Sequence, residues 1–261
     1  TDFKKILTNE KVKKYFFDKL IFDSNSIANH LDFFLNTQFA FSVLIQADKV
    51  DAMDSKVINN DRSKVMDFCH LYPETLKNYI KKFQPDSELN KLRTQIREES
   101  ISNIQKLLHT GKRVFELTAP TGSGKTIMLL SLASEIFKKQ GNYRIVYALP
   151  FLSITEQVEK EVLDIFKEFE NENFIQRIDS KGNNHQFNEL QEELDSNPDD
   201  EKIKELDFLA FQEQVFAYPF VITTFVRFFE TLLSNHNATL LKLPNFSKSI
   251  LKFPFHSNEA A

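Results

Sequence analysis

Residues 119–126, with the sequence APTGSGKT, have the types and spacing of a phosphate-binding loop. Gly122 and Gly124 let the backbone curl so that successive N–H groups face inward, and a helix expected after the loop adds the positive end of its dipole. The Lys125 ammonium supplies a full charge to the β and γ phosphates, and the Thr126 hydroxyl is the expected Mg²⁺ ligand. The residues expected to hold the phosphates are Ala119, Pro120, Thr121, Gly122, Ser123, Gly124, Lys125 and Thr126. The pattern therefore predicts a nucleoside triphosphate and Mg²⁺ as cofactors.

The elements on either side of the loop are those that such a loop requires. Residues 114–118 are expected to form a short apolar strand, and residues 124–139 have the period of a helix. An ordinary glycine turn is the alternative, but two of the five glycines of the chain fall inside this loop. The pattern departs at Ala119, where glycine is usual, and this exchange is typical of one branch of phosphate-loop motors.

Strands and helices alternate through the rest of the second part of the chain. Further strands are expected at residues 143–149 and 220–223, and helices at 154–169 and 225–233. Such alternation predicts βαβ units and a parallel sheet covered on both faces. An earlier polar helix is expected from residue 87 or 89 to about 109. Nine acidic residues against two lysines between residues 189 and 207 indicate a solvated helical insertion.

Composition limits the class of protein. The chain has 261 residues, 41% of them hydrophobic, and a formal net charge of -4. This hydrophobic content can fill a sizeable core, which excludes general disorder. The expected setting is soluble and cytoplasmic, because no apolar run reaches membrane-spanning length and Cys69 is the only cysteine.

Residues 1–83 show helical spacing and almost no strand signal. Phe39, Val43 and Leu44 belong to a stripe that predicts a buried helix face, and Asp48 continues it. A carboxylate on a buried face needs a partner, so Asp48 is predicted to be either a metal ligand or one half of a buried ion pair. The histidines lack metal-ligand spacing, and we expect all six to be packed or surface residues.

Four segments resemble a known family. Residues 117–126 resemble motif I of superfamily 2 helicases. Residues 144–157 look like motif Ia of the CRISPR-associated helicase-nuclease of type I systems, and residues 221–230 are similar to its motif Ib. Upstream, residues 41–51 resemble the last helix of the HD nuclease domain of that family.

The resemblance implies an architecture and an activity. Residues 1–84 would be the C-terminal helical part of the HD nuclease domain, and residues 89–250 most of the first RecA-like lobe. The acidic insertion would cover 185–207, and 251–261 would be an atypical tail. In the intact family, ATP drives 3′ to 5′ translocation on single-stranded DNA, a linked nuclease degrades that strand, and an RNA-guided surveillance complex recruits the enzyme in antiviral defence.

The resemblance also implies roles for particular residues. Arg93 and Gln95 lie where related helicases read adenine, although the exposed face of an amphipathic helix explains them equally well. Asp48 occupies the position of a ligand to the divalent transition metals of the nuclease. The residues implied to contact single-stranded DNA are Ser153, Gln157, Thr223 and Thr224. The alternative for the two threonines is β-branched filling of a strand.

The sequence departs from the family in two places. It contains no His-Asp pair, so the chain as given is not expected to cut DNA by itself. An apolar strand ending in Asp-Glu should follow Ile250, but Leu251, Lys252, Phe253 and Pro254 come instead. Very slow ATP hydrolysis and an incomplete chain without a second lobe are therefore expected. Two further readings stay open: a non-hydrolysing nucleotide-binding or interaction module, and a phosphate-loop NTPase that is not a helicase.

Overall fold

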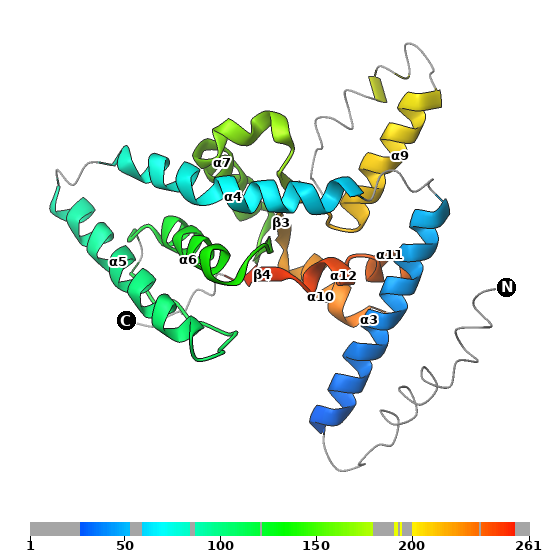
Figure 1. The fold of residues 1–261 in the computed structure, drawn as a ribbon, viewed down its shortest axis with the longest axis horizontal. Helices are drawn as coiled ribbons and strands as arrows, with labels where there is room; N and C mark the ends of the chain where they lie inside the picture. Colours follow the sequence, from blue (N-terminus) through cyan, green and yellow to red (C-terminus); the bar gives the residue numbers. More distant parts are fainter. Residues whose placement is uncertain are drawn as a thin grey trace.

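The computed structural model describes residues 27–52, 59–83, 87–120, 122–179, 191–192, 194, 200–234 and 236–253. Helices are the main elements of this part of the chain, and four strands lie among them (Figure 1). The elements in chain order are α3 (Ile27–Ala52), α4 (Asn59–Lys81), α5 (Glu88–Leu108), α6 (Lys125–Gln140), β1 (Arg144–Leu149), α7 (Leu152–Ile165), η2 (Lys167–Glu172), β2 (Ile175–Ile178), α9 (Asp200–Gln214), β3 (Phe220–Thr224), α10 (Phe225–Leu233), α11 (Asn237–Leu240), α12 (Leu243–Phe246) and β4 (Ser249–Lys252).

The four strands form one parallel sheet in the order β2-β3-β1-β4. Leu149 at the end of β1 is the register partner of Thr224 at the end of β3, so the two strands leave the sheet side by side. β1 and β3 are buried along nearly their whole length, as expected of parallel strands covered on both faces. The predicted α/β class with a RecA-like parallel sheet is confirmed.

Alternate residues of β1 point into two different hydrophobic clusters. Ile145, Tyr147 and Leu149 face the cluster that includes α4, α6 and α7. Val146 and Ala148 face the cluster that includes α10, α11 and α12. This period of two places a layer of helices on each side of the sheet.

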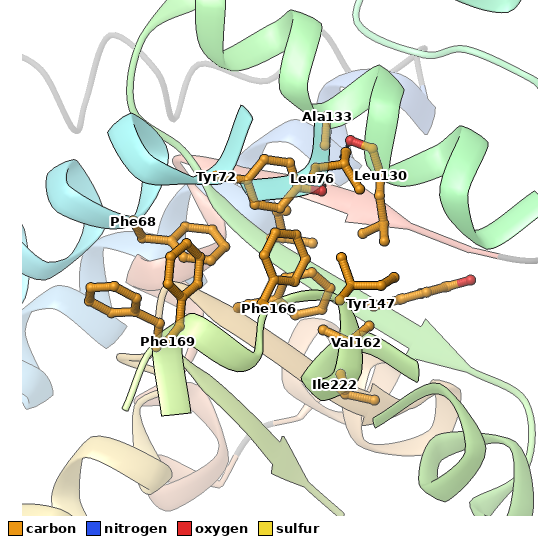
Figure 2. Packing of buried hydrophobic residues seen from close by; sticks show 14 of the residues in the cluster. Phe68, Tyr72, Leu76, Leu130, Ala133, Tyr147, Val162, Phe166, Phe169 and Ile222 are labelled. Carbon is orange, nitrogen blue, oxygen red and sulfur yellow. Dashed lines mark hydrogen bonds between the residues drawn. The ribbon is translucent and has the colours of Figure 1, made fainter. Parts of the chain in front are cut away.

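The larger cluster is built on aromatic rings (Figure 2). Phe68 and Tyr72 of α4 are fully buried in it, and the Tyr72 ring stacks on Phe166 with 4.7 Å between centroids. The Tyr72 hydroxyl donates a hydrogen bond to the Leu130 carbonyl of α6 at 3.0 Å, so its polar atom is satisfied. Within the described residues, α4 therefore shares one core with the sheet, and the predicted domain boundary near residue 84 does not separate two cores.

Helix α3 packs on the opposite layer and contacts α11 and α12 (Figure 1). The Gln38 side-chain amide donates to the Ser234 carbonyl at 3.0 Å. The stripe predicted to be buried is not: Phe39, Val43 and Leu44 are each more than a third exposed. The prediction was wrong because α3 carries apolar residues all round, so the spacing could not identify the face that packs.

Residues 114–118 do not form the predicted strand. They are described as irregular chain, and Val114 is 90% exposed. A strand needs hydrogen bonds to a neighbour, and this segment pairs with none of the described strands. The expected helices at 124–139, 154–169 and 225–233 are confirmed as α6, α7 and α10, with small shifts at some ends.

Candidate nucleotide-binding site

The predicted phosphate-binding loop leads into the N-terminus of α6. Gly122 and Gly124 have φ angles of 78° and 84°, a left-handed conformation that side chains with a Cβ rarely adopt. Gly124 is the N-cap of α6, and no side chain there accepts a hydrogen bond from the first N–H groups of the helix. Lys125 and Thr126 therefore begin the helix where its free N–H groups and dipole favour an anion. Thr121 lies outside the described residues.

Ser123 gives this loop a polar group with no partner. Its side chain is 7% exposed, and its Oγ is buried without a hydrogen bond among the described residues. Leaving a buried hydroxyl unsatisfied costs roughly 1–3 kcal/mol. A phosphate oxygen in the loop would remove that cost, so the residues present fit a nucleotide phosphate.

Arg93 of α5 reaches the loop. Its Nε and Nη2 both donate to the Gly122 carbonyl, at 3.0 and 2.8 Å, and its Nη1 donates to the Asn90 side chain at 3.2 Å. The structure thus brings Arg93 and the loop together. Gln95, the other residue predicted to read adenine, is exposed on the same helix.

Thr126 lies against an acidic residue of α7. Its hydroxyl forms a side-chain hydrogen bond to the Glu161 carboxylate; burial raises the pKa of that carboxyl, and the hydrogen bond acts in the opposite direction. Mg²⁺ prefers hard oxygen ligands and needs only one or two from the protein when phosphates supply others. The oxygen atoms present therefore fit Mg²⁺, and Thr126 is the residue that would hold it.

Three of the residues predicted to contact DNA lie at the carboxyl ends of β1 and β3, and one lies further along α7. Ser153 and Gln157 of α7 are exposed. Thr223 is fully buried, and its hydroxyl donates to the Ile178 carbonyl of β2 at 2.7 Å. Thr224 accepts from the Arg227 N–H at 3.3 Å as the N-cap of α10. Both hydroxyls thus stabilise the fold, and a DNA contact of either threonine stays a prediction.

A buried network fixes the first turn of α7 to the end of β2. The Thr155 hydroxyl donates to the Asp179 carboxylate at 2.8 Å. Arg177 forms an ion pair with Glu159 at 2.8 Å and lies 3.4 Å from Asp179. Charge-assisted bonds in a buried setting are among the strong ones, so this network holds the beginning of α7 in place.

The sequence did not single out two exposed apolar residues at this edge. Phe151 is 63% exposed and Val226 is 64% exposed. They follow the paired strand ends Leu149 and Thr224, at the beginnings of α7 and α10. Phe228 is buried in the core, whereas Phe229 is 45% exposed. A large apolar residue two positions after the end of a buried strand was the signal available in the sequence for Phe151.

Asp48 is exposed on α3. Water solvates an exposed carboxylate, so Asp48 needs neither a metal nor a buried ion-pair partner, and the prediction of a buried position was wrong. Within the part of the chain that the structure describes, no group of three or more His, Cys, Asp or Glu side chains could hold a metal ion. The role of Asp48 as a ligand of the nuclease metals stays a prediction.

The structure is an α/β domain in which the predicted phosphate-binding loop leads into the N-terminus of a helix. Residues 87–214 match the model of a known family, described as the type III restriction enzyme, res subunit. This family is helicase-like and ATP-hydrolysing, with ATP and Mg²⁺ as its typical cofactors, and it indicates an ATP-dependent nucleic-acid motor. Among curated proteins, the chain has no match. The described helices include none long and apolar enough to cross a membrane.

Proposed function

We propose that this chain carries the nucleotide-binding lobe of an ATP-dependent motor that moves on single-stranded nucleic acid. The observation that supports it most directly is the loop at residues 119–126, where the buried Ser123 hydroxyl, which has no partner among the described residues, lies next to Lys125 and the N-terminus of α6. The helicase-like family match over residues 87–214 supports the same class.

The residues of the loop divide the work of holding a triphosphate. The free N–H groups at the beginning of α6 bind phosphate oxygens, and the Lys125 ammonium neutralises charge on the β and γ phosphates. The Thr126 hydroxyl would hold Mg²⁺, which would neutralise part of the charge on the phosphates. The Ser123 hydroxyl donates to a phosphate oxygen and gains the partner that it lacks within the described part of the chain.

Nucleic acid would lie across the beginnings of α7 and α10. Ser153 and Gln157 can donate hydrogen bonds to phosphates, which position a strand without reading its sequence. The exposed Phe151 ring offers a stacking surface for a base. In open parallel sheets, ligands bind beyond the carboxyl ends of the strands, and these residues lie at that edge.

The test is binding of Mg-ATP by the 261-residue chain, measured by isothermal titration calorimetry. We expect a saturable heat for the wild type and a loss of affinity of about tenfold or more for Lys125→Ala, because an ammonium–phosphate contact is charge-assisted. The matched control is Lys106→Ala, which removes an exposed lysine of α5. Absence of binding by well-folded wild-type protein, or equal binding by both variants, would refute the proposal.

The finer hypothesis is that the motor is the CRISPR-associated helicase-nuclease of type I systems. It rests on the resemblance of residues 144–157 and 221–230 to motifs Ia and Ib, and of residues 41–51 to an HD nuclease helix. It includes the domain boundaries given above, a divalent transition metal at Asp48 and an RNA-guided surveillance complex as partner. DNA-stimulated ATPase activity of the full-length parent protein, lost in Lys125→Ala, is the expected result, and ATPase activity indifferent to DNA would count against it.

A second candidate is a module that binds ATP without hydrolysing it. The feature that favours it is β4, where the predicted family would carry an acid at the end of the strand and this chain has Lys252. Without a carboxylate there, the water-polarising group is lacking from β4. Tight Mg-ATP binding with no phosphate release over hours would support this candidate, and multiple turnovers would exclude it.

A further inference from the structure

Arg93 of α5 binds the backbone of the predicted phosphate-binding loop. Its guanidinium donates twice to one backbone oxygen, the Gly122 carbonyl, from a helix 29 residues earlier in the chain. Asn90, one turn earlier on α5, accepts from the remaining side of the same guanidinium at 3.2 Å. The arginine is thus oriented by its own helix before it reaches the loop.

Helix α5 is itself fixed to α6, the helix that follows the loop. The Gln105 side chain donates to the Glu135 carboxylate at 2.6 Å, and Lys138 forms an ion pair with the same carboxylate at 2.6 Å. Ile104 and Leu108 of α5 are buried. The helix that carries Arg93 is therefore held against α6 by contacts outside the loop.

The peptide between Gly122 and Ser123, whose carbonyl Arg93 binds, could otherwise flip. Gly122 has a φ of 78° and no Cβ, and an added Cβ would meet no atom within 4 Å, so side-chain packing at this residue does not restrict its peptide. In a trans peptide the C=O and the following N–H point in opposite directions. With the Gly122 carbonyl turned to Arg93, the Ser123 N–H points back into the loop and donates to the Pro120 carbonyl at 3.3 Å. A flipped peptide would instead turn a carbonyl oxygen toward the phosphates, which repel it.

We infer that Arg93 is a positioning residue: it locks the Gly122 peptide so that the loop is shaped for a polyphosphate before any nucleotide arrives. This differs from the adenine-reading role predicted from the sequence, because the bonds go to the loop backbone. The inference rests on the proposed function. It also predicts that the benefit of Arg93 belongs to the phosphate chain and not to the base.

The experiment compares three probes in the presence of Mg²⁺: ATP, GTP and inorganic tripolyphosphate. Binding to wild type, Arg93→Ala and Arg93→Lys is measured by isothermal titration calorimetry, with circular dichroism as a check of folding. For Arg93→Ala we expect a loss of about tenfold for each of the three probes, because two charge-assisted hydrogen bonds are removed. Arg93→Lys should recover part of the loss, since lysine keeps the charge but not the planar fork. Lys91→Ala, which removes an exposed cation of the same helix that pairs with Glu88, should change none of them.

The outcomes distinguish a failure of the proposed function from a failure of the inference about Arg93. No binding of any probe by wild type would overturn the proposed function and this inference with it. Binding by wild type with unchanged affinities in Arg93→Ala would overturn the inference alone. A loss confined to ATP, with tripolyphosphate unaffected, would also overturn it and return Arg93 to adenine recognition. If Arg93→Ala fails to fold, Arg93→Lys carries the comparison, and equal affinity of that variant and wild type for tripolyphosphate would count against the inference.

Discussion

Replacing Lys252 by methionine should stabilise the protein and remove part of its pH dependence. Lys252 ends β4 with its side chain buried, its Nζ has no hydrogen-bond partner among the described residues, and it lies 5.6 Å from the centre of the Tyr147 ring. Burial lowers the pKa of this amine from 10.5 to about 7. A charged amine in an apolar layer is costly, so the folded state holds it neutral above that pH.

The sign and size of the effect follow from proton linkage. Between about pH 7 and pH 10.5 the unfolded chain binds a proton at Lys252 that the folded chain does not, so stability rises with pH by about 1.4 kcal/mol per unit. From about pH 7.5 to pH 9 this amounts to about 2 kcal/mol. Lys252→Met should lose this contribution to the slope and gain roughly 4 kcal/mol at about pH 7.5, where the proton cost is largest within that interval.

The assay is urea unfolding followed by circular dichroism, at several pH values, for wild type and Lys252→Met. Lys242, whose pKa burial lowers to about 8, titrates in the same range but is present in both proteins and cancels in the difference. Lys248→Met provides the control, because Lys248 is exposed in the turn before β4. A difference in unfolding free energy that does not change with pH would show that Lys252 is solvated or paired, and the reasoning would fail.

Three further predictions concern the loop at residues 119–126, the thiol of Cys69 and the proposed contact of Phe151 with nucleic acid. Gly122→Ala should cost about 1–2 kcal/mol through its left-handed backbone and weaken ATP binding, whereas Gly111→Ala, with a φ of 75°, should cost as much in thermal unfolding but leave ATP affinity unchanged. Cys69, whose pKa burial raises to about 11, should react with a disulfide reagent at pH 8 far more slowly in the native protein than in urea. Phe151→Ala should weaken binding of labelled oligo(dT) about tenfold in fluorescence anisotropy, and Leu163→Ala, exposed further along α7, should not.

The central strands could be predicted because their sequence is continuously apolar. The expected strands at 143–149 and 220–223 correspond to β1 and β3, which are buried on both faces. β2 gave no such signal, because its inner residues include Gln176 and the ion-paired Arg177. β4 was masked by Lys252, a charge where an apolar residue is expected. A polar or charged residue inside a sheet can be assigned to a strand only when the residues that surround it in the structure are known.

The candidate site could be predicted in its local part only. The loop and α6 follow from adjacent residues, whose glycine and lysine types carry the signal. The contact between Arg93 and Gly122 joins residues 29 positions apart, and nothing in the local spacing of α5 distinguishes it from an exposed cation. The partner of Thr126, Glu161, is likewise set by the packing of α7 and not by any motif.

The burial of α4 has a practical consequence for dividing this protein. The family match begins at residue 87, but Phe68, Tyr72 and Leu76 fill the centre of the sheet's larger hydrophobic layer. A chain cut to residues 87–214 would expose the aromatic side chains of this cluster to water and would tend to aggregate. Helix α4 shares the hydrophobic core of the sheet, so a division of the chain that keeps this core intact falls before α4.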